Sequence, residues 1–144
     1  MIRPATSGDL QAVREIVRAA YVHYVPRIGR EPGPMGDDYA ARIAARETFV
    51  TGEPVKGVIV LIDEADHLLL DNIAVDPAAH GTGVGRKLLQ FADQEAVRRG
   101  YNELRLYTHE KMTENVALYA RAGWEETHRA EQNGFPRVFF RKTV

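Results

Sequence analysis

The segment between residues 67 and 108 places the strongest constraint on the fold. His67 to Val75 is almost continuously apolar, which is typical of a strand buried on both faces. A glycine-rich turn follows, and the helix expected from about Gly83 to Arg99 carries apolar residues at helical spacing. Glu103 to Thr108 is the next predicted strand. Because a strand, a crossover helix and a second strand form one unit, we expect the two strands to be parallel neighbours in a sheet.

The rest of the chain contributes helices and hairpins around this unit. We predict a strand over residues 1 to 5, helices over Thr6 to Tyr24, Asp37 to Arg46 and Thr113 to Ala122, and strands over Glu47 to Thr51, Val55 to Ile62, Trp124 to Glu131 and Arg137 to Thr143. The Pro- and Gly-rich stretch Arg27 to Gly36 is expected to be a loop. The order β-α-α-β-β-β-α-β-α-β-β predicts an α/β (α+β) fold with about four helices and a mixed, mostly antiparallel sheet of about seven strands.

The composition fits a single domain over residues 1–144. Of the 144 residues, 44% are hydrophobic and 27% are charged, and the sequence has neither an internal repeat nor a linker. A chain of this length buries enough surface to fold without disulfides or a structural metal. The chain has no cysteine, which excludes disulfides, thiolate metal sites and a cysteine nucleophile, and which fits a cytoplasmic location.

Charge and residue spacing argue against several other classes of protein. The formal net charge is -1, whereas a domain that neutralises nucleic-acid phosphates is usually strongly basic, so we expect no nucleic-acid partner. Met1 to Pro4 does not resemble an export signal, and apolar runs such as Val58 to Ile62 are too short to span a membrane, so we expect no membrane partner. The histidines share no metal-ligand spacing, so we expect no metal.

The segment His80 to Lys87 carries the chemistry. Its glycines at positions 81, 83 and 85 let the backbone approach a ligand closely, and free N–H groups at the start of a helix attract an anion such as a phosphate. A tight strand-to-helix turn without any ligand is the alternative interpretation. The spacing departs from the nucleoside-triphosphate loop, because Gly85 is followed by Arg86, and from the dinucleotide fingerprint, because a single residue separates Gly83 from Gly85.

The spacing resembles the pyrophosphate loop of the GNAT superfamily of acyl-CoA-dependent N-acetyltransferases, usually written Q/R-x-x-G-x-G/A. His80 stands in the first position of that loop, and Gly83 and Gly85 stand in the glycine positions. Ile73 to Pro77 resembles the strand and exit that precede it, and Thr113 to Tyr119, followed by Gly123 and Trp124, resembles the second signature of the family. The chain departs from the family in having His80 for Gln or Arg, and in having Asn115 four residues before Tyr119 instead of seven.

The resemblance covers nearly the whole chain and implies a GNAT-like fold that binds acetyl-CoA as its co-substrate. The family places CoA between the strands over 67–75 and 103–108. Its pantetheine would pair with the backbone of Ile73, Ala74 and Val75. The remaining cofactor contacts implied by the resemblance are those of His80, Gly81, Thr82, Gly83, Val84, Gly85 and Asn115.

The implied reaction is direct transfer of an acetyl group to the primary amine of a small molecule or a peptide N-terminus. Tyr119 matches the family's proton donor to the leaving thiolate, although a tyrosine here can also simply pack. Candidate bases are Asp71, His109 and Glu110, and each is equally consistent with a solvated or paired surface group. No base is assigned.

The first two helices and their joining loop usually overhang the acceptor in this family. We expect Tyr24 and Asn72 to contact the acceptor, with Tyr21 and Tyr39 either in the same pocket or in the core. A non-catalytic acyl-CoA-binding module and a nucleotide-binding regulator are the alternative functions. The terminal strands, Trp124 to Glu131 and Arg137 to Thr143, are expected to be edge strands that could support a homodimer.

Overall fold

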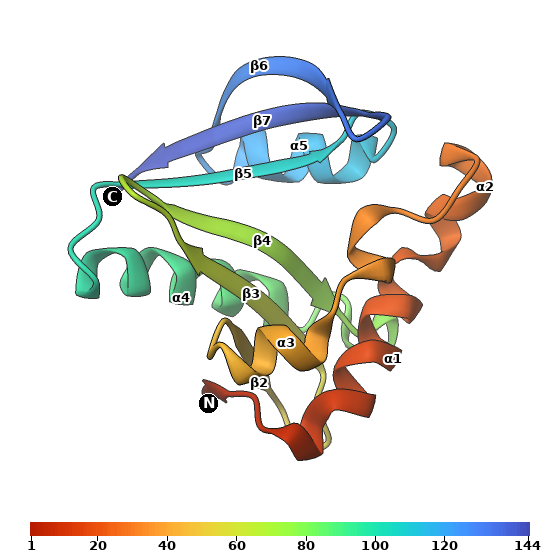
Figure 1. Ribbon diagram of the computed structural model, residues 1–144, viewed down its shortest axis with the longest axis vertical. Coiled ribbons are helices and arrows are strands. Elements are labelled where there is room, and N and C mark those ends of the chain that lie inside the picture. The colour runs from red at the N-terminus through yellow and green to blue at the C-terminus, as the bar shows by residue number, and fades with distance from the viewer. The chain divides into compact units, whose positions relative to one another are not determined.

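The computed structural model describes residues 1–144 (Figure 1). Its strands are β1 (Ile2–Pro4), β2 (Thr48–Thr51), β3 (Gly57–Asp63), β4 (Leu68–Val75), β5 (Glu103–His109), β6 (Glu125–Gln132) and β7 (Phe135–Thr143). Its helices are α1 (Leu10–Tyr21), the single turn α2 (Val25–Ile28), α3 (Tyr39–Ala44), α4 (Val84–Arg98) and α5 (Thr113–Arg121). Short 3-10 turns are η1 (Ser7–Asp9), η2 (Val22–Tyr24), η3 (Gly33–Gly36) and η4 (Pro77–Ala79).

The strands are hydrogen-bonded neighbours in the order β1-β2-β3-β4-β5-β7-β6. Leu68 and Leu69 of β4 pair in parallel with Leu104 and Arg105 of β5. The pairs β1–β2, β2–β3, β5–β7 and β6–β7 are antiparallel. The predicted mixed, mostly antiparallel sheet of seven strands, with one parallel crossover, is therefore confirmed.

The chain divides into two compact units. Unit 1 comprises Met1–Ile62 and Leu70–Ala92, and unit 2 comprises Asp63–Leu69 and Asp93–Val144. Their boundaries fall inside β3, β4 and α4. The single domain over residues 1–144 stays a prediction, and the two units are described separately below.

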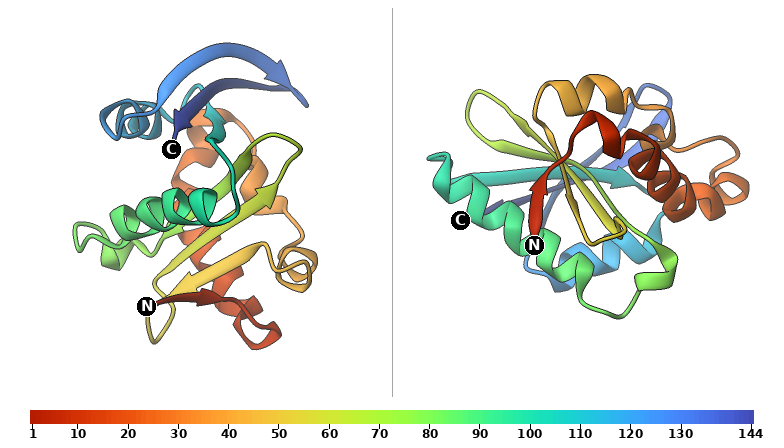
Figure 2. Two further views of the ribbon diagram at one scale, coloured as in Figure 1. Left: turned by 90° about the vertical axis from the view of Figure 1, so that its left-hand side faces the viewer. Right: turned by 90° about the horizontal axis from the view of Figure 1, so that it is seen from below.

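Unit 1 packs helices on both faces of its strands. In Figures 1 and 2, α3 lies on one face of β3 and the first part of α4 lies on the other. The rings of Phe49 on β2 and Phe91 on α4 are 5.0 Å apart. Helix α1 buries Val13, Ile16 and Val17 at helical spacing. Since β3 is covered on both faces, its residues from Val58 to Leu61 are completely buried.

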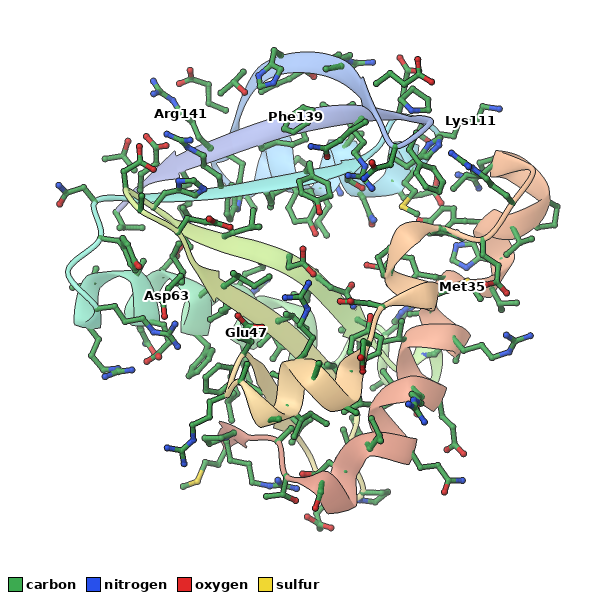
Figure 3. All side chains as sticks on the ribbon, in the orientation of Figure 1. Met35, Glu47, Asp63, Lys111, Phe139 and Arg141 are labelled. Carbon is green, nitrogen blue, oxygen red and sulfur yellow. The ribbon has the colours of Figure 1, made fainter.

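Unit 2 is an antiparallel sheet with α5 against one face. Strand β5 pairs with β7 along its whole length, from Glu103 opposite Thr143 to His109 opposite Arg137. Tyr119 of α5 is 5% exposed, and its ring lies 5.9 Å from that of Phe140 on β7. Strand β6, by contrast, is exposed along all of its 8 residues. Figure 3 shows Phe139 and Arg141 on β7 of this unit.

The structure corrects three details of the sequence interpretation. The first helix breaks into η1, α1 and η2, and the turn α2 then occupies the start of the predicted loop until Gly29 ends it at φ 90°. The second helix spans Tyr39–Ala44 only, because the Asp38 side chain caps its start by accepting from the Ala41 N–H. Strand β7 is not an edge strand, because it lies between β5 and β6. Of the two terminal strands, β6 alone is at the edge.

Candidate functional site

The loop between β4 and α4 belongs to unit 1 and is built from successive tight turns. Asp76 accepts a hydrogen bond from the Ala78 N–H at 3.0 Å, which starts η4. The Thr82 hydroxyl then donates to the Ala79 carbonyl at 2.5 Å. Gly81 and Gly83 have φ values of 78° and 87°, in the left-handed region that favours glycine. The predicted alternation of glycines is therefore required by the backbone at positions 81 and 83.

The backbone of this loop presents free hydrogen-bond donors at the start of α4. The first amide of the helix with a backbone acceptor is that of Lys87, which donates to the Gly83 carbonyl at 3.0 Å. The N–H groups of Gly81, Gly83, Val84 and Gly85 donate to no protein acceptor. A Cβ at Gly81 or Gly83 would meet nothing within 4 Å, so the space beside both residues is open. Free donors at the positive end of a 15-residue helix have the geometry that attracts an anion.

A close contact with β3 positions this helix start. A Cβ built on Gly57 would lie 2.7 Å from Cγ1 of Val84 and 3.0 Å from Cδ1 of Leu88. The absence of a side chain at Gly57 therefore lets α4 approach the strand. The sequence contains a signal for this contact, because an isolated glycine in an apolar strand indicates a close approach, but the sequence interpretation did not use it.

The end of β4 leads directly into the loop. Ile73 and Val75 are partly exposed and Ala74 is 3% exposed. The carbonyl of Ile73 accepts a hydrogen bond from the Tyr21 hydroxyl at 3.0 Å. His80 is exposed, and its backbone N–H donates to Pro77 at 3.2 Å. Six of the predicted cofactor residues, His80 to Gly85, are thus consecutive in the loop and the start of α4, and Ile73, Ala74 and Val75 precede them at the end of β4.

The two predicted acceptor contacts lie on different elements of unit 1. Asn72 on β4 is 4% exposed, and its amide is hydrogen-bonded to the hydroxyls of Tyr21 and Tyr39. Tyr24 on η2 is 5% exposed. The centre of its ring lies 3.9 Å from the centre of the His23 ring and 5.1 Å from the guanidinium carbon of Arg27. The sequence offers no signal for the bonds of Asn72, because they join positions 51 and 33 residues apart.

Unit 2 holds the predicted proton donor. Tyr119 and Asn115 are one helical turn apart on α5, so they share a face of the helix. The Asn115 amide donates to the Met112 sulfur at 3.6 Å. The ring of Tyr119 packs edge-on against Trp124 at 6.0 Å. The packing role and the proton-donor role of Tyr119 therefore use different parts of the side chain, the ring and the hydroxyl.

The candidate bases differ in their surroundings. His109 is buried, and its Nδ1 accepts the Lys111 N–H at 3.0 Å, so the other nitrogen carries the proton of the neutral ring. Glu110 is exposed and pairs with Arg129 at 3.3 Å. Asp71 is partly exposed, and its carboxylate helps to raise the pKa of Tyr39, after burial and Asp37. Glu110 is therefore held in a surface ion pair.

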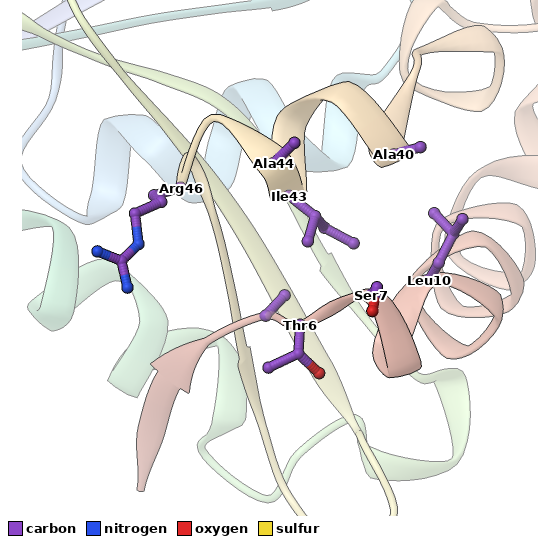
Figure 4. A pocket seen from close by; sticks show the side chains of 8 residues that line it. Thr6, Ser7, Leu10, Ala40, Ile43, Ala44 and Arg46 are labelled. Atoms are coloured by element: carbon purple, nitrogen blue, oxygen red, sulfur yellow. The ribbon is translucent and has the colours of Figure 1, made fainter.

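A separate cavity of about 360 Å³ lies in unit 1 beside α3 (Figure 4). None of the predicted site residues lines it; its walls are formed by Ala5, Thr6, Ser7, Leu10, Ala40, Ile43, Ala44 and Arg46. The Thr6 hydroxyl is already engaged with Asp9 at 3.1 Å. The remaining wall is mainly alkyl, so the cavity offers no acid–base chemistry.

No group of three or more His, Asp or Glu side chains is arranged to hold a metal ion. No helix combines the length and the apolar character needed to cross a bilayer.

The comparison with protein families identifies the chain. A family model described as an acetyltransferase (GNAT) domain matches residues 41–126, which is more than half of the sequence. The chain belongs to the GNAT acetyltransferase family. This confirms the resemblance found in the loop and the α5 segment, and it confirms the predicted class of enzyme, an acyltransferase. A comparison with curated protein sequences found no match.

Solved structures share the GNAT fold over the whole chain. The PaiA N-acetyltransferase from Thermoplasma acidophilum, in complex with coenzyme A, has a TM-score of 0.82 at 17% identity and covers 100% of this chain and 98% of its own. The ribosomal-protein-S18-alanine N-acetyltransferase from Escherichia coli has a TM-score of 0.78 at 21% identity. The alignment covers 100% of this chain and 93% of the E. coli chain. The yncA protein from Salmonella typhimurium, a putative acetyltransferase solved with its cofactor acetyl-CoA, has a TM-score of 0.73 at 22% identity. The alignment covers 99% of this chain and 92% of the Salmonella chain.

Proposed function

We propose that this GNAT protein transfers an acetyl group from acetyl-CoA directly to a primary amine, on a small molecule or at a peptide or protein N-terminus. The observation that carries the proposal is the set of unpartnered N–H groups of Gly81, Gly83, Val84 and Gly85 at the start of α4. Such a set suits the pyrophosphate of a CoA ester, because it combines several donors with the positive end of a long helix.

The cofactor contacts follow the strand into the helix. The backbone groups of Ile73, Ala74 and Val75 would bind the pantetheine amides, and the loop would bind the pyrophosphate, with exposed His80 and Thr82 at its rim. Asn115 is assigned to the same cofactor through the second family signature. Structural neighbours that hold coenzyme A or acetyl-CoA support this choice of ligand.

The reaction balances without a covalent enzyme intermediate. The amine nitrogen forms a bond to the acetyl carbon, the carbon–sulfur bond breaks, and the electron pair stays on sulfur. A small alkyl amine has a pKa of roughly 10 and a peptide α-amine one of about 8, so the protonated form of either loses one proton to water or a base before attack. Tyr119 donates its hydroxyl proton to the thiolate, and the second proton of the attacking nitrogen is released to water and restores the Tyr119 hydroxyl, which leaves the free CoA thiol and a neutral N-acetyl product. Direct transfer is consistent with a chain that contains no cysteine nucleophile.

The acceptor is assigned to the side of unit 1 formed by Tyr24, Asn72 and the segment 33–36 that joins the first helices. A peptide beginning with alanine is a reasonable probe, since one structural neighbour is named for the alanine of ribosomal protein S18. A homodimer formed through the edge strand β6 and a cytoplasmic location stay predictions.

The function is tested by measuring cofactor binding and turnover separately. Calorimetry compares acetyl-CoA, ATP and NAD, and thiol release from acetyl-CoA is then followed with an alanine-initiated hexapeptide and with spermidine. We expect acetyl-CoA alone to bind, and at least one amine to give thiol release with an acetylated product in the mass spectrum.

Other outcomes select the alternatives. Binding of acetyl-CoA without acetylation of any amine in a broad panel would indicate a non-catalytic acyl-CoA-binding module. Preferential binding of ATP or NAD would indicate a nucleotide-binding regulator and would refute the proposal for the loop.

A further inference from the structure

Three buried side chains of unit 1 form a hydrogen-bond chain that the reaction itself does not need. Tyr21 on α1, Tyr39 on α3 and Asn72 on β4 are 7%, 2% and 4% exposed. The Tyr21 hydroxyl lies 2.7 Å from Oδ1 of Asn72, and Nδ2 of Asn72 lies 2.9 Å from the Tyr39 hydroxyl. The Tyr39 hydroxyl lies 2.6 Å from the carbonyl of Pro34. The chain therefore joins the cofactor strand to the segment η3.

The direction of each hydrogen bond follows from the Pro34 end. A carbonyl oxygen can only accept, so the Tyr39 hydroxyl must donate to Pro34. The same hydroxyl then accepts from the Asn72 amide nitrogen, which leaves the amide oxygen to accept from Tyr21. Burial, followed by the carboxylates of Asp37 and Asp71, raises the pKa of Tyr39. Tyr39 is therefore a protonated donor at any physiological pH.

Tyr21 has one proton for two acceptors. Its hydroxyl lies 2.7 Å from the Asn72 amide oxygen and 3.0 Å from the carbonyl of Ile73. Ile73 is the first strand residue assigned to the pantetheine in the proposed function. A pantetheine N–H that bound the Ile73 carbonyl would make this oxygen a weaker acceptor for Tyr21, because the carbonyl would then serve two donors, and would shift the Tyr21 proton toward Asn72. Because bonds in a chain polarise one another, the bonds from Asn72 to Tyr39 and from Tyr39 to Pro34 would then strengthen.

Few other bonds hold the middle of η3. The Met35 N–H donates to the Pro32 carbonyl at 3.0 Å. Beyond the segment, the Asp37 carboxylate is held by Arg42 at 3.1 Å, and Arg42 also pairs with Glu47 at 3.1 Å. Figure 3 shows Met35 on this segment. Segment η3 also packs beside α1, and the Tyr39 hydroxyl adds the hydrogen bond that joins Pro34 to α3.

We propose that Tyr21, Asn72 and Tyr39 are positioning residues that couple acyl-CoA binding on β4 to the ordering of the acceptor-side segment Gly33–Gly36. The inference rests on the proposed function for the identity of the cofactor and the acceptor side. It assigns Asn72 to shaping the acceptor site through Tyr39, because both polar atoms of the Asn72 amide are used inside the protein.

Hydrogen exchange at the Met35 amide tests the coupling without knowledge of the natural acceptor. In the wild-type protein, saturating acetyl-CoA should slow this exchange by up to about twofold, because polarisation adds roughly 10–30% to each existing hydrogen bond and creates no new one. Tyr39→Phe should speed exchange in the free protein and remove the response to acetyl-CoA. Tyr21→Phe should leave exchange in the free protein near the wild-type value and remove the response alone, because it keeps the bonds from Asn72 to Pro34.

Kinetics give a second measurement. With the alanine-initiated hexapeptide, Tyr39→Phe should raise KM for the peptide by roughly fivefold, while kcat and the Kd for acetyl-CoA stay within about twofold. The matched control is Tyr101→Phe, which removes the hydroxyl that donates to Asp63 and Glu64 in unit 2. Tyr101→Phe should leave both the Met35 response and the peptide KM unchanged.

The failures are distinguishable. If wild-type protein does not bind acetyl-CoA, the proposed function fails, and unaltered Met35 exchange in free Tyr39→Phe would then overturn the anchoring role as well. If acetyl-CoA binds but leaves Met35 exchange unchanged, or if the Tyr21→Phe and Tyr39→Phe variants respond like wild type, the coupling is refuted while the proposed function stands.

Discussion

Gly57→Ala tests whether the contact between β3 and α4 holds the phosphate loop in place. The new methyl carbon would lie 2.7 Å from Val84 Cγ1, 3.0 Å from Leu88 Cδ1 and 3.1 Å from Thr51 Cγ2. Ordinary carbon–carbon contacts are about 3.5–4.0 Å, so Val84 has to move by about 0.8 Å or more. Overpacking costs about 1–3 kcal/mol, partly offset by about 0.4–1 kcal/mol from the reduced freedom of the unfolded chain. We expect a net loss of about 1–2 kcal/mol.

The assays are urea unfolding, thermal melting and calorimetry with acetyl-CoA. The melting temperature should fall by about 3–6 °C. The Kd for acetyl-CoA should rise about tenfold, since the N–H of Val84 is one of the free donors of the loop and a bond to a charged group is worth about 1.5–3 kcal/mol. Val84→Ala removes the closest clashing atom. The double variant should therefore be more stable than the sum of the two changes predicts, by about 1 kcal/mol.

Gly8→Ala is the matched control for this experiment. A Cβ at Gly8 meets only the Thr6 hydroxyl, at an ordinary 3.7 Å. Its stability should stay within about 0.5 kcal/mol of wild type. If Gly57→Ala is as stable as Gly8→Ala and binds acetyl-CoA like wild type, the contact does not position the loop.

Three further predictions concern the loop, the proton donor and pH. Gly83→Glu should weaken acetyl-CoA binding at least tenfold, because it puts a negative side chain and a strained left-handed residue into the phosphate site, and calorimetry measures this. Tyr119→Phe should lower kcat at least tenfold in the thiol-release assay while the Kd for acetyl-CoA changes less than threefold. The hydrogen bonds from Arg3, and then from the Thr6 N–H, lower the pKa of Asp9 well below its usual range. Stability from Asp9 is therefore present above about pH 4 and lost below it, so urea unfolding should show the deficit of Asp9→Asn shrinking from pH 7 to pH 3.

Each of these predictions has a control and a refuting result. Gly100→Glu imposes a similar backbone strain at φ 83°, with nothing within 4 Å, and equal loss of binding in both glycine variants would refute the phosphate site. Wild-type turnover in Tyr119→Phe would mean that the tyrosine only packs. Glu15→Gln, an exposed carboxylate on α1, should lose no stability at pH 7, and a constant deficit of Asp9→Asn at every pH would contradict the role of its charge.

The strand-loop-helix unit was predictable because its signals are local. The apolar run of β4, the glycines at 81 and 83 and the helical spacing of α4 each specify the backbone within a few residues. The structure places them as expected. The break of the first helix was less predictable. Pro26 is tolerated in the first turn of a new helix, so its presence is equally consistent with a loop and with the short helix α2.

The long-range contacts of the site could not be derived from the sequence. Asn72 has the same pattern as any polar residue on a strand, and its two tyrosine partners are fixed only when α1 and α3 pack on β4. The position of β7 between β5 and β6 could not be derived from the sequence for the same reason. Periodicity identifies a strand, whereas the identity of its neighbours depends on which pairing the whole fold makes possible.

Trp124 gives the protein an internal optical probe. It is the single tryptophan of the chain, it is 5% exposed, and it packs on Tyr119 within unit 2. Tryptophan fluorescence therefore follows the unfolding of unit 2 alone, whereas far-ultraviolet circular dichroism also follows α1 and α3 in unit 1. Coincident transitions by the two methods would mean that the units unfold cooperatively, and separate transitions would give each unit its own stability.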